Sequence, residues 1–450
     1  MIKIIARNVL LCIVTQFLLL IIHSPSYALD VERTVLDNGL TLLTVERHNL
    51  PMVKVAVGLK AGSLMEPEEK AGLANLAASL LTEGTRTRTS REISEAIEFV
   101  GGSVGAGGGD DYSTARLSVL KKDVELGFDL LSDIMLHPSF PQDELNKKKE
   151  RIKAGLKARE EDPGFVAAKE FKKAIFGSHP YGRLVSGTEE TLDALSRDDI
   201  VRFHSTYYVP NSAIMAVVGD ISAAEVTSLL KRYFSDWHAG EVKKPSQLPP
   251  KQKRERQTVT IDKDLTQATI KIGHRGVSRG NPDYYAVSVM NYILGGGGFA
   301  SRLMLNIREE KGLVYDIHSF FDANKYGGSF QVGLQTKNES ANVAIKEVLE
   351  EIKKIKNGPV SDAELSDAKS FLTGSFPMRI ETSSRIASFL VAVEYYDLGV
   401  AYIDNYPVYI NSISKEDIMR VAKRYLDDAE FTLVVVADQE KASLKDEWIK

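Results

Sequence analysis

Residues 72–85 read Gly-Leu-Ala-Asn-Leu-Ala-Ala-Ser-Leu-Leu-Thr-Glu-Gly-Thr. Apolar residues recur in this stretch at i, i+3, i+4, i+7 and i+8, the spacing of one helical face. They are Leu73, Leu76, Ala77, Leu80 and Leu81. The opposite stripe carries Asn75, Ala78 and Ser79. The stretch therefore predicts an amphipathic helix with its apolar face against a core.

The two halves of the chain repeat each other. The segment Ser196-Arg-Asp-Asp-Ile-Val-Arg202 matches Ser414-Lys-Glu-Asp-Ile-Met-Arg420 at an offset of 218 residues. At the same offset, the strand-like residues 214–220 match residues 432–438. Upstream, residues 143–145 match residues 363–365 at an offset of 220. Chance is a poor explanation for several aligned blocks in the same order, so the repeat predicts two homologous domains.

Local patterns indicate that each half mixes strands and helices. Asn38-Gly39 between apolar residues is a hairpin signal, and residues 53–57 alternate as in a half-buried strand. In the second half we expect strands at 268–272 and 329–336 and helices at 341–356 and 362–371. Hairpins with helices packed on one face predict an α+β fold, each domain an antiparallel sheet covered by helices.

The amino terminus is typical of an export signal. Residues 1–28 combine Lys3 and Arg7, an apolar run over 9–22, and Ser-Tyr-Ala at 26–28. The alternative, an uncleaved anchor, is disfavoured because a membrane span needs about 20 apolar residues. The one cysteine, Cys12, lies in this segment, so the mature chain would carry no thiol. We expect an exported protein, periplasmic or extracellular, with no membrane contact after signal cleavage.

Composition and linkers complete the domain boundaries. A chain of 450 residues with 43% hydrophobic content and a net charge of -4 can bury a large core. The basic runs at 147–149 and 251–256 are followed or interrupted by acids, so nothing indicates nucleic-acid binding. Residues 239–256 contain three prolines and no apolar periodicity, as a linker does. We therefore divide the chain into a signal (1–28), an N-terminal domain (29–238), a linker (239–256) and a C-terminal domain (257–450).

Several further motifs occur in a fixed order along the chain. They are Ser178-His-Pro-Tyr-Gly182, Gly187-Thr188, Tyr207-Tyr-Val-Pro-Asn211, Val217-Val-Gly-Asp220, and the glycine run that leads through Arg308 to Tyr315. With the 72–85 helix, they make the whole mature chain resemble the inverted-zincin peptidases, the family of pitrilysin, insulin-degrading enzyme and mitochondrial processing peptidase. The resemblance implies two such α+β domains forming half of a clamshell around a chamber.

The resemblance also shows what this chain lacks. In the family, the helix reads Gly-Leu-Ala-His-x-x-Glu-His, where two histidines bind zinc and the glutamate activates the zinc-bound water. Asn75, Ala78 and Ser79 occupy those three positions here. The family's third ligand, a glutamate on a later helix, falls near Gly155 and Leu156. We therefore expect a degenerate zinc site and no metal or other cofactor in this chain.

A second family feature is retained. The family has a glycine-rich turn, here Gly295, Gly296, Gly297 and Gly298, followed by an arginine and a tyrosine seven residues apart, here Arg308 and Tyr315. By resemblance, this pair lines the chamber opposite the zinc and hydrogen-bonds the substrate backbone, and the glycine loop handles substrate. A guanidinium and a phenol can both donate hydrogen bonds to a developing oxyanion. The alternative is structural: Arg308 pairs with an acid on its helix and Tyr315 packs within a strand.

Other chemistries are weakly supported. No Gly-Lys-Ser/Thr follows the glycine run, which disfavours a phosphate loop. No two of the eight histidines have ligand spacing, so a zinc site would need ligands from distant segments. No Gly-x-Ser-x-Gly elbow is present.

The leading hypothesis is an exported, zinc-lacking subunit of a two-chain metallopeptidase. A homologous partner chain would bring the zinc and the base, and this chain would bring Arg308 and Tyr315. The substrates would be peptides or unfolded segments, held by strand addition to a sheet edge. Two rivals stay open: a non-enzymatic scaffold or peptide-binding protein of the same fold, and a self-sufficient peptidase with unrecognised ligands.

Overall fold

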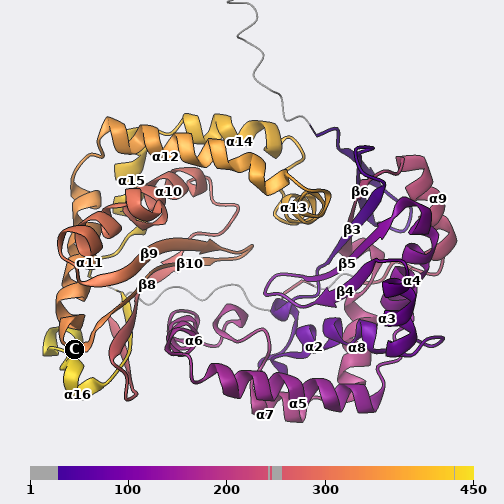
Figure 1. Cartoon of the computed structure of the whole chain (residues 1–450), viewed down its shortest axis with the longest axis horizontal. Helices are drawn as coiled ribbons and strands as arrows, with labels where there is room; N and C mark the ends of the chain where they lie inside the picture. The colour runs from indigo at the N-terminus through magenta and orange to yellow at the C-terminus, as the bar shows by residue number, and fades with distance from the viewer. Residues whose placement is uncertain (1–28, 242–243, 246–255, 430, 450) are drawn as a thin grey trace, which may run out of the picture.

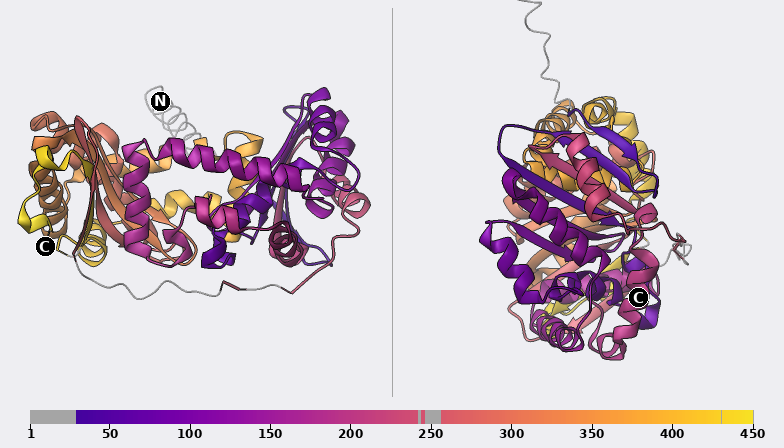
Figure 2. Two further views of the ribbon diagram at one scale, coloured as in Figure 1. Left: turned by 90° about the horizontal axis from the view of Figure 1, so that it is seen from below. Right: turned by 90° about the vertical axis from the view of Figure 1, so that its right-hand side faces the viewer.

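The computed structural model describes residues 29–241, 244–245, 256–429 and 431–449. The predicted export signal and most of the predicted linker lie outside these ranges. No helix in the described part of the chain has the length and apolarity needed to cross a membrane. Two sheets stand at opposite ends of the molecule, joined by helices that run between them (Figures 1 and 2).

The first half builds a sheet of order β1-β2-β6-β3-β5-β4. Its strands are β1 (Glu32–Val35), β2 (Thr41–Glu46), β3 (Met52–Leu59), β4 (Ser103–Gly107), β5 (Ser113–Leu120) and β6 (Ala213–Gly219). Its helices are α2 (Leu73–Ser79), α3 (Ser90–Phe99), α4 (Val124–Leu136), α5 (Gln142–Arg159), α6 (Pro163–Phe176), α7 (Glu189–Ala194), α8 (Arg197–Tyr207) and α9 (Ala223–Tyr233).

The second half builds a sheet of order β7-β11-β8-β10-β9. Its strands are β7 (Gln257–Asp262), β8 (Gln267–Gly276), β9 (Val314–Ala323), β10 (Gly328–Lys337) and β11 (Thr432–Ala437). Its helices are α10 (Tyr284–Asn291), α11 (Ala341–Asn357), α12 (Asp362–Ser375), α13 (Ser383–Tyr395), α14 (Tyr402–Asn411), α15 (Lys415–Tyr425), α16 (Gln439–Ala442) and α17 (Asp446–Ile449).

The repeat found in the sequence is a repeat in the structure. Helices α8 and α15 differ by 218 residues at both ends, and each begins with the same capping box, Ser196 with Asp199 and Ser414 with Asp417. The strand order of the second sheet reproduces that of the first without its edge strand β1. The α+β architecture and the strands and helices predicted from local patterns are thus confirmed.

The sheets are mixed, which corrects the expectation of purely antiparallel sheets. β2 pairs with β6 in parallel, and β7 pairs with β11 in parallel, whereas the other pairs are antiparallel. In both cases a strand from the start of a domain pairs with one from its end, after several helices have intervened. A long crossover of this kind permits parallel pairing, and no local pattern reveals it.

Each half lends a helix to the other half's sheet. Val166, Ala167 and Phe171 of α6 pack against Val434 and Val436 of β11. Reciprocally, α13 contacts β3 and β6 of the first sheet. The approach is close enough that a Cβ on Gly58 of β3 would lie 2.4 Å from Val391 Cγ1. The exchanged helices cover the central strands β3, β6, β8 and β11 on their second face and join the two halves.

A buried carboxylate also links the halves. Asp111, in the β4–β5 turn, accepts hydrogen bonds from Tyr181 Oη of its own half and from two groups of the other half. The latter are Tyr396 Oη at 2.9 Å and the Lys325 backbone N–H at 3.0 Å. Tyr395 Oη donates to the Asp111 carbonyl at 3.0 Å. Burial raises the pKa of Asp111, and these donors oppose the shift.

Candidate functional site

The helix of the predicted degenerate zinc site is α2. It begins after Gly72, whose φ of 99° is readily available only to glycine. Glu66 caps the helix start by accepting the backbone N–H groups of Gly72 at 3.0 Å and Ala74 at 2.8 Å. The Glu66 side chain is buried, and loss of hydration raises its pKa to about 7. No local sequence pattern indicated that Glu66 would be buried as a helix cap.

The three positions that match the family's zinc-binding residues share one face of α2 but offer no metal ligand set. Asn75 and Ser79 are half-buried, and Ala78 is buried. Ser79 Oγ donates to the Leu76 carbonyl at 3.2 Å, as a serine does within a helix. An amide, a methyl group and a hydroxyl do not form the nitrogen and carboxylate set that zinc requires. The α2 face therefore does not fit a zinc ion.

The strand beside α2 also leaves little space there. Residues 101–109 contain a turn and β4. A Cβ on Gly108, just after β4, would lie 2.5 Å from Asn75 Cα, so the two backbones are in close contact. Position 108 therefore needs a glycine, because any side chain there would collide with the backbone of α2.

The position of the family's third ligand carries no substitute. Gly155 is exposed on α5, and Leu156 packs against the first-half core. The flanking acids have other partners: Glu150 pairs with Lys153 at 2.7 Å, and Glu160 with Lys169 at 2.6 Å. Within the described ranges, no three His, Asp or Glu side chains are grouped closely enough to hold a metal ion.

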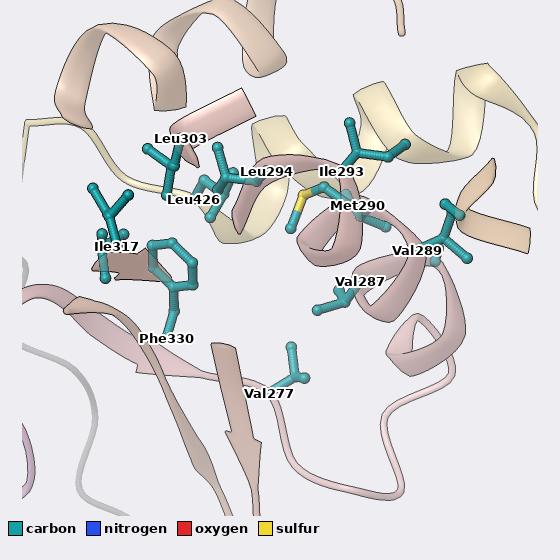
Figure 3. Close-up of a cluster of buried hydrophobic side chains, with 14 of the residues drawn as sticks. Val277, Val287, Val289, Met290, Ile293, Leu294, Leu303, Ile317, Phe330 and Leu426 are labelled. Carbon is teal, nitrogen blue, oxygen red and sulfur yellow. The ribbon is translucent and has the colours of Figure 1, made fainter. Parts of the chain in front are cut away.

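The glycine run Gly295–Gly298 begins within one π-helical turn, η7 (Tyr292–Gly296), and leads toward a second, η9 (Met304–Glu310). Ile293 and Leu294 before the run and Leu303 after it are buried in the second-half core, as Figure 3 shows. The run is thus anchored at both ends. Its first glycine is held tightly, since a Cβ on Gly295 would lie 2.5 Å from Ser319 Oγ, whereas Gly298 has a φ of 57° and open space around it.

Arg308 and Tyr315 come together at the end of this segment. Arg308 lies in η9, and Tyr315 follows at the start of β9. The guanidinium carbon of Arg308 lies 5.2 Å from the centre of the Tyr315 ring, within cation–π range. Tyr315 is 82% exposed, which excludes the alternative that it is ordinary strand packing. Arg308 does contact an acid on its helix, Glu309, at 3.6 Å, a loose pair that leaves most guanidinium donors available.

A third residue of the cluster, Phe299, was not predicted. Its ring centre lies 4.6 Å from the Arg308 guanidinium carbon, and the side chain is 64% exposed. Phe299 directly follows the glycine run, so the run carries an aromatic ring that contacts the arginine. A large exposed apolar residue after four glycines is the one sequence signal that could have indicated it.

The chain has two α+β domains of like topology, a zinc-type helix without metal ligands, and an Arg–Tyr pair whose tyrosine is exposed. Together these features define a half-clamshell of the metallopeptidase type. Comparison with known protein families gives the same class. The family description "Insulinase (Peptidase family M16)" matches residues 41–189, and "Peptidase M16 inactive domain" matches residues 194–372. The chain therefore belongs to peptidase family M16, the insulinase family.

Individual relatives support the same assignment. An uncharacterized zinc protease of Bacillus subtilis is 26% identical over 354 residues, covering 79% of this chain and 85% of the relative. An uncharacterized zinc protease of Mycobacterium leprae is 29% identical over 357 residues, covering 78% of this chain and 79% of the relative. The crystal structure of a peptidase M16 inactive domain from Pseudomonas fluorescens has a TM-score of 0.85 at 27% identity, covering 91% of this chain and 98% of that one. The crystal structure of a protease from Helicobacter pylori shares the fold, with a TM-score of 0.83 at 23% identity. The match covers 91% of this chain and 100% of that one.

Proposed function

We propose that this chain is the zinc-lacking subunit of an exported two-chain M16 peptidase. A homologous chain supplies the zinc and the base for peptide hydrolysis, and this chain supplies Arg308 and Tyr315. The observation that carries the proposal is a contrast within one molecule. The α2 face has lost every metal-ligand side chain, whereas Arg308 and Tyr315 remain together and Tyr315 remains exposed.

The division of labour is physically reasonable. Hydrolysis needs charge stabilisation where the oxyanion develops, and this can come from donors on a subunit other than the one that activates water. Arg308 has several guanidinium donors, and the Tyr315 phenol adds one more. A substrate held in an extended conformation across both subunits gains from fixed orientation, which contributes several kcal/mol in favourable cases. The substrates in this proposal are peptides or unfolded segments.

The experiment is reconstitution. Peptide hydrolysis is measured for this chain, for a homologous chain from the same genome with the intact His-x-x-Glu-His helix, and for their mixture. We expect activity from the mixture far above either chain alone, and a heterodimer in size-exclusion chromatography. Zinc is measured in each purified chain by atomic emission, with zinc expected in the partner only.

Each result distinguishes the alternatives. Stoichiometric zinc and activity in this chain alone would establish a self-sufficient peptidase. Peptide binding with no complex and no gain in activity would establish a non-enzymatic binding protein of the same fold. Export is tested separately, by mass spectrometry of the protein secreted from its own cells, which should begin at residue 29.

A further inference from the structure

A hollow of about 290 Å³ opens beside Tyr315 on the second sheet. Strands β8, β9 and β10 form its floor, and Gly164, in the first turn of α6, contributes to its wall. Residues from both halves of the chain therefore line it. Apart from Tyr315, the reaction proposed above uses none of the residues that line it.

Three of these residues form one row across the sheet. Lys271 of β8 is paired with Gly333 of β10, and Gly333 is paired in turn with His318 of β9. Paired residues of neighbouring strands place their side chains on the same face. The row continues to Val434 of β11, which α6 covers. The row is thus apolar and covered at one end and polar and open at the other.

The missing side chain of Gly333 leaves room between two nitrogen atoms. A Cβ at this position would lie 3.5 Å from Lys271 Nζ and 3.5 Å from His318 Nε2. An atom bound over Gly333 would therefore approach both nitrogens at once. The other imidazole nitrogen, His318 Nδ1, lies 3.1 Å from Asp316 Oδ2. Asp316 also lines the hollow, but its carboxylate contacts the ring nitrogen that is not the one near Gly333.

Lys271 has no anionic partner among the residues that the structure describes. Its one hydrogen bond within the described residues goes to the neutral Gln331 Oε1 at 3.0 Å, although an ammonium has three donors. Burial lowers the pKa of Lys271, and no carboxylate in the described part of the chain opposes the shift. A partly desolvated ammonium of this kind gains more from an anion than a surface lysine does.

We propose that Lys271 and His318, over the floor made by Gly333, form a binding subsite for a carboxylate of the substrate peptide. The subsite lies beside Tyr315, so the carboxylate belongs to a residue close to the bond that faces the Arg308–Tyr315 pair. This inference rests on the proposed function for its setting and predicts a preference for acidic peptides. The carboxylate can be a glutamate or aspartate side chain or the peptide's carboxyl terminus.

Binding to the purified chain, without any partner subunit, tests the subsite. The probes are four fluorescein-labelled versions of one short unstructured peptide, with a central glutamate or glutamine and with a free or amidated carboxyl terminus. Fluorescence anisotropy gives each Kd. We expect a carboxylate to tighten binding by about tenfold, because a charge-assisted hydrogen bond contributes roughly that factor. The glutamate and free-terminus arms distinguish the two sources of the carboxylate.

Two variants remove the subsite in different ways. Lys271→Met removes the charge, and Gly333→Val fills the space between the two nitrogens while the charge remains. Both should abolish the preference for the carboxylate while the affinity for the doubly neutral peptide stays unchanged. Lys346→Met, on the exposed face of α11, is the matched control and should keep the preference.

The result that overturns the proposal is equal affinity of the wild-type chain for acidic and neutral peptides, or no binding of any of them. A preference that survives both Lys271→Met and Gly333→Val also overturns it. Because the readout is binding to one chain, it is separate from reconstitution: a failed reconstitution with an intact preference refutes the two-chain function and leaves the subsite.

Discussion

Replacing Asp111 by alanine should weaken the whole molecule, because this carboxylate joins the two halves. Its side chain accepts three hydrogen bonds, two of them from the second half, at 2.9 Å and 3.0 Å. Each donor left without a partner costs about 1 to 3 kcal/mol when buried. Water entering the vacated space offsets part of this, so we expect the free energy of unfolding to fall by about 3 to 5 kcal/mol.

The assay uses the chain's two tryptophans. Trp237 is buried in the first-half core, and Trp448 is buried in the core of the second half. Urea unfolding followed in Trp237→Phe and Trp448→Phe backgrounds therefore reports each half separately. Because α6 and α13 are exchanged between the halves, both tryptophans should report one transition, and Asp111→Ala should shift it equally for both.

The control is Asp397→Asn, which removes an exposed charge that also pairs with the second-half residue Lys325 and keeps a side chain that tolerates the positive φ of 57° at this position. It should cost less than about 1 kcal/mol, as exposed ion pairs do. The reasoning is refuted if Asp111→Ala costs no more than this control. It is also refuted if only one tryptophan reports the loss.

Three further predictions concern stability. The pKa of Glu66 is raised from 4.5 to about 7, so the folded state holds a proton that the unfolded state has released, and stability should fall by about 3 kcal/mol as pH rises from 4 to 8. Glu66→Gln should remove this slope in urea unfolding at several pH values, and an unchanged slope would show that other groups cause it. Phe330→Ala, in the core drawn in Figure 3, should lower the free energy of unfolding by about 3 to 5 kcal/mol, and a loss below about 1 kcal/mol would contradict the packing described for this core. Gly58→Val should displace α13 from the first sheet and cost about 2 kcal/mol or more in thermal unfolding, whereas an unchanged Tm would mean that α13 is not held there.

Sequence patterns were sufficient to predict the helices and strands whose signals lie in neighbouring residues or in the internal repeat. The capping boxes at Ser196 and Ser414 mark helix starts, and the 218-residue offset predicts the matching helices and strands. The parallel partners of β2 and β7 were missed because pairing between the two ends of a domain has no local signature. The exchange of α6 and α13 was missed for the same reason, since an apolar helix face does not identify the sheet that it covers.

The candidate site was predictable in part. Asn75, Ala78, Ser79, Arg308 and Tyr315 could be singled out from the sequence because the family motifs have fixed spacing, and their roles stay predictions. Phe299 and Asp111 were not found, because their contacts join segments whose spatial relation depends on the complete fold. The Lys271–Gly333–His318 row was also hidden, since it follows from the register of three strands and not from any single segment.

The central claim is that this chain brings Arg308 and Tyr315 to a shared active site. The direct measurement is kcat for peptide hydrolysis by the reconstituted pair, with this chain either wild type or Arg308→Ala/Tyr315→Phe. Loss of donors to a developing oxyanion typically lowers kcat by about 100-fold or more, and we expect a fall of that size with complex formation intact. Arg91→Ala, at an exposed arginine of α3, is the control and should leave kcat unchanged. An unchanged kcat in the double variant would contradict the account.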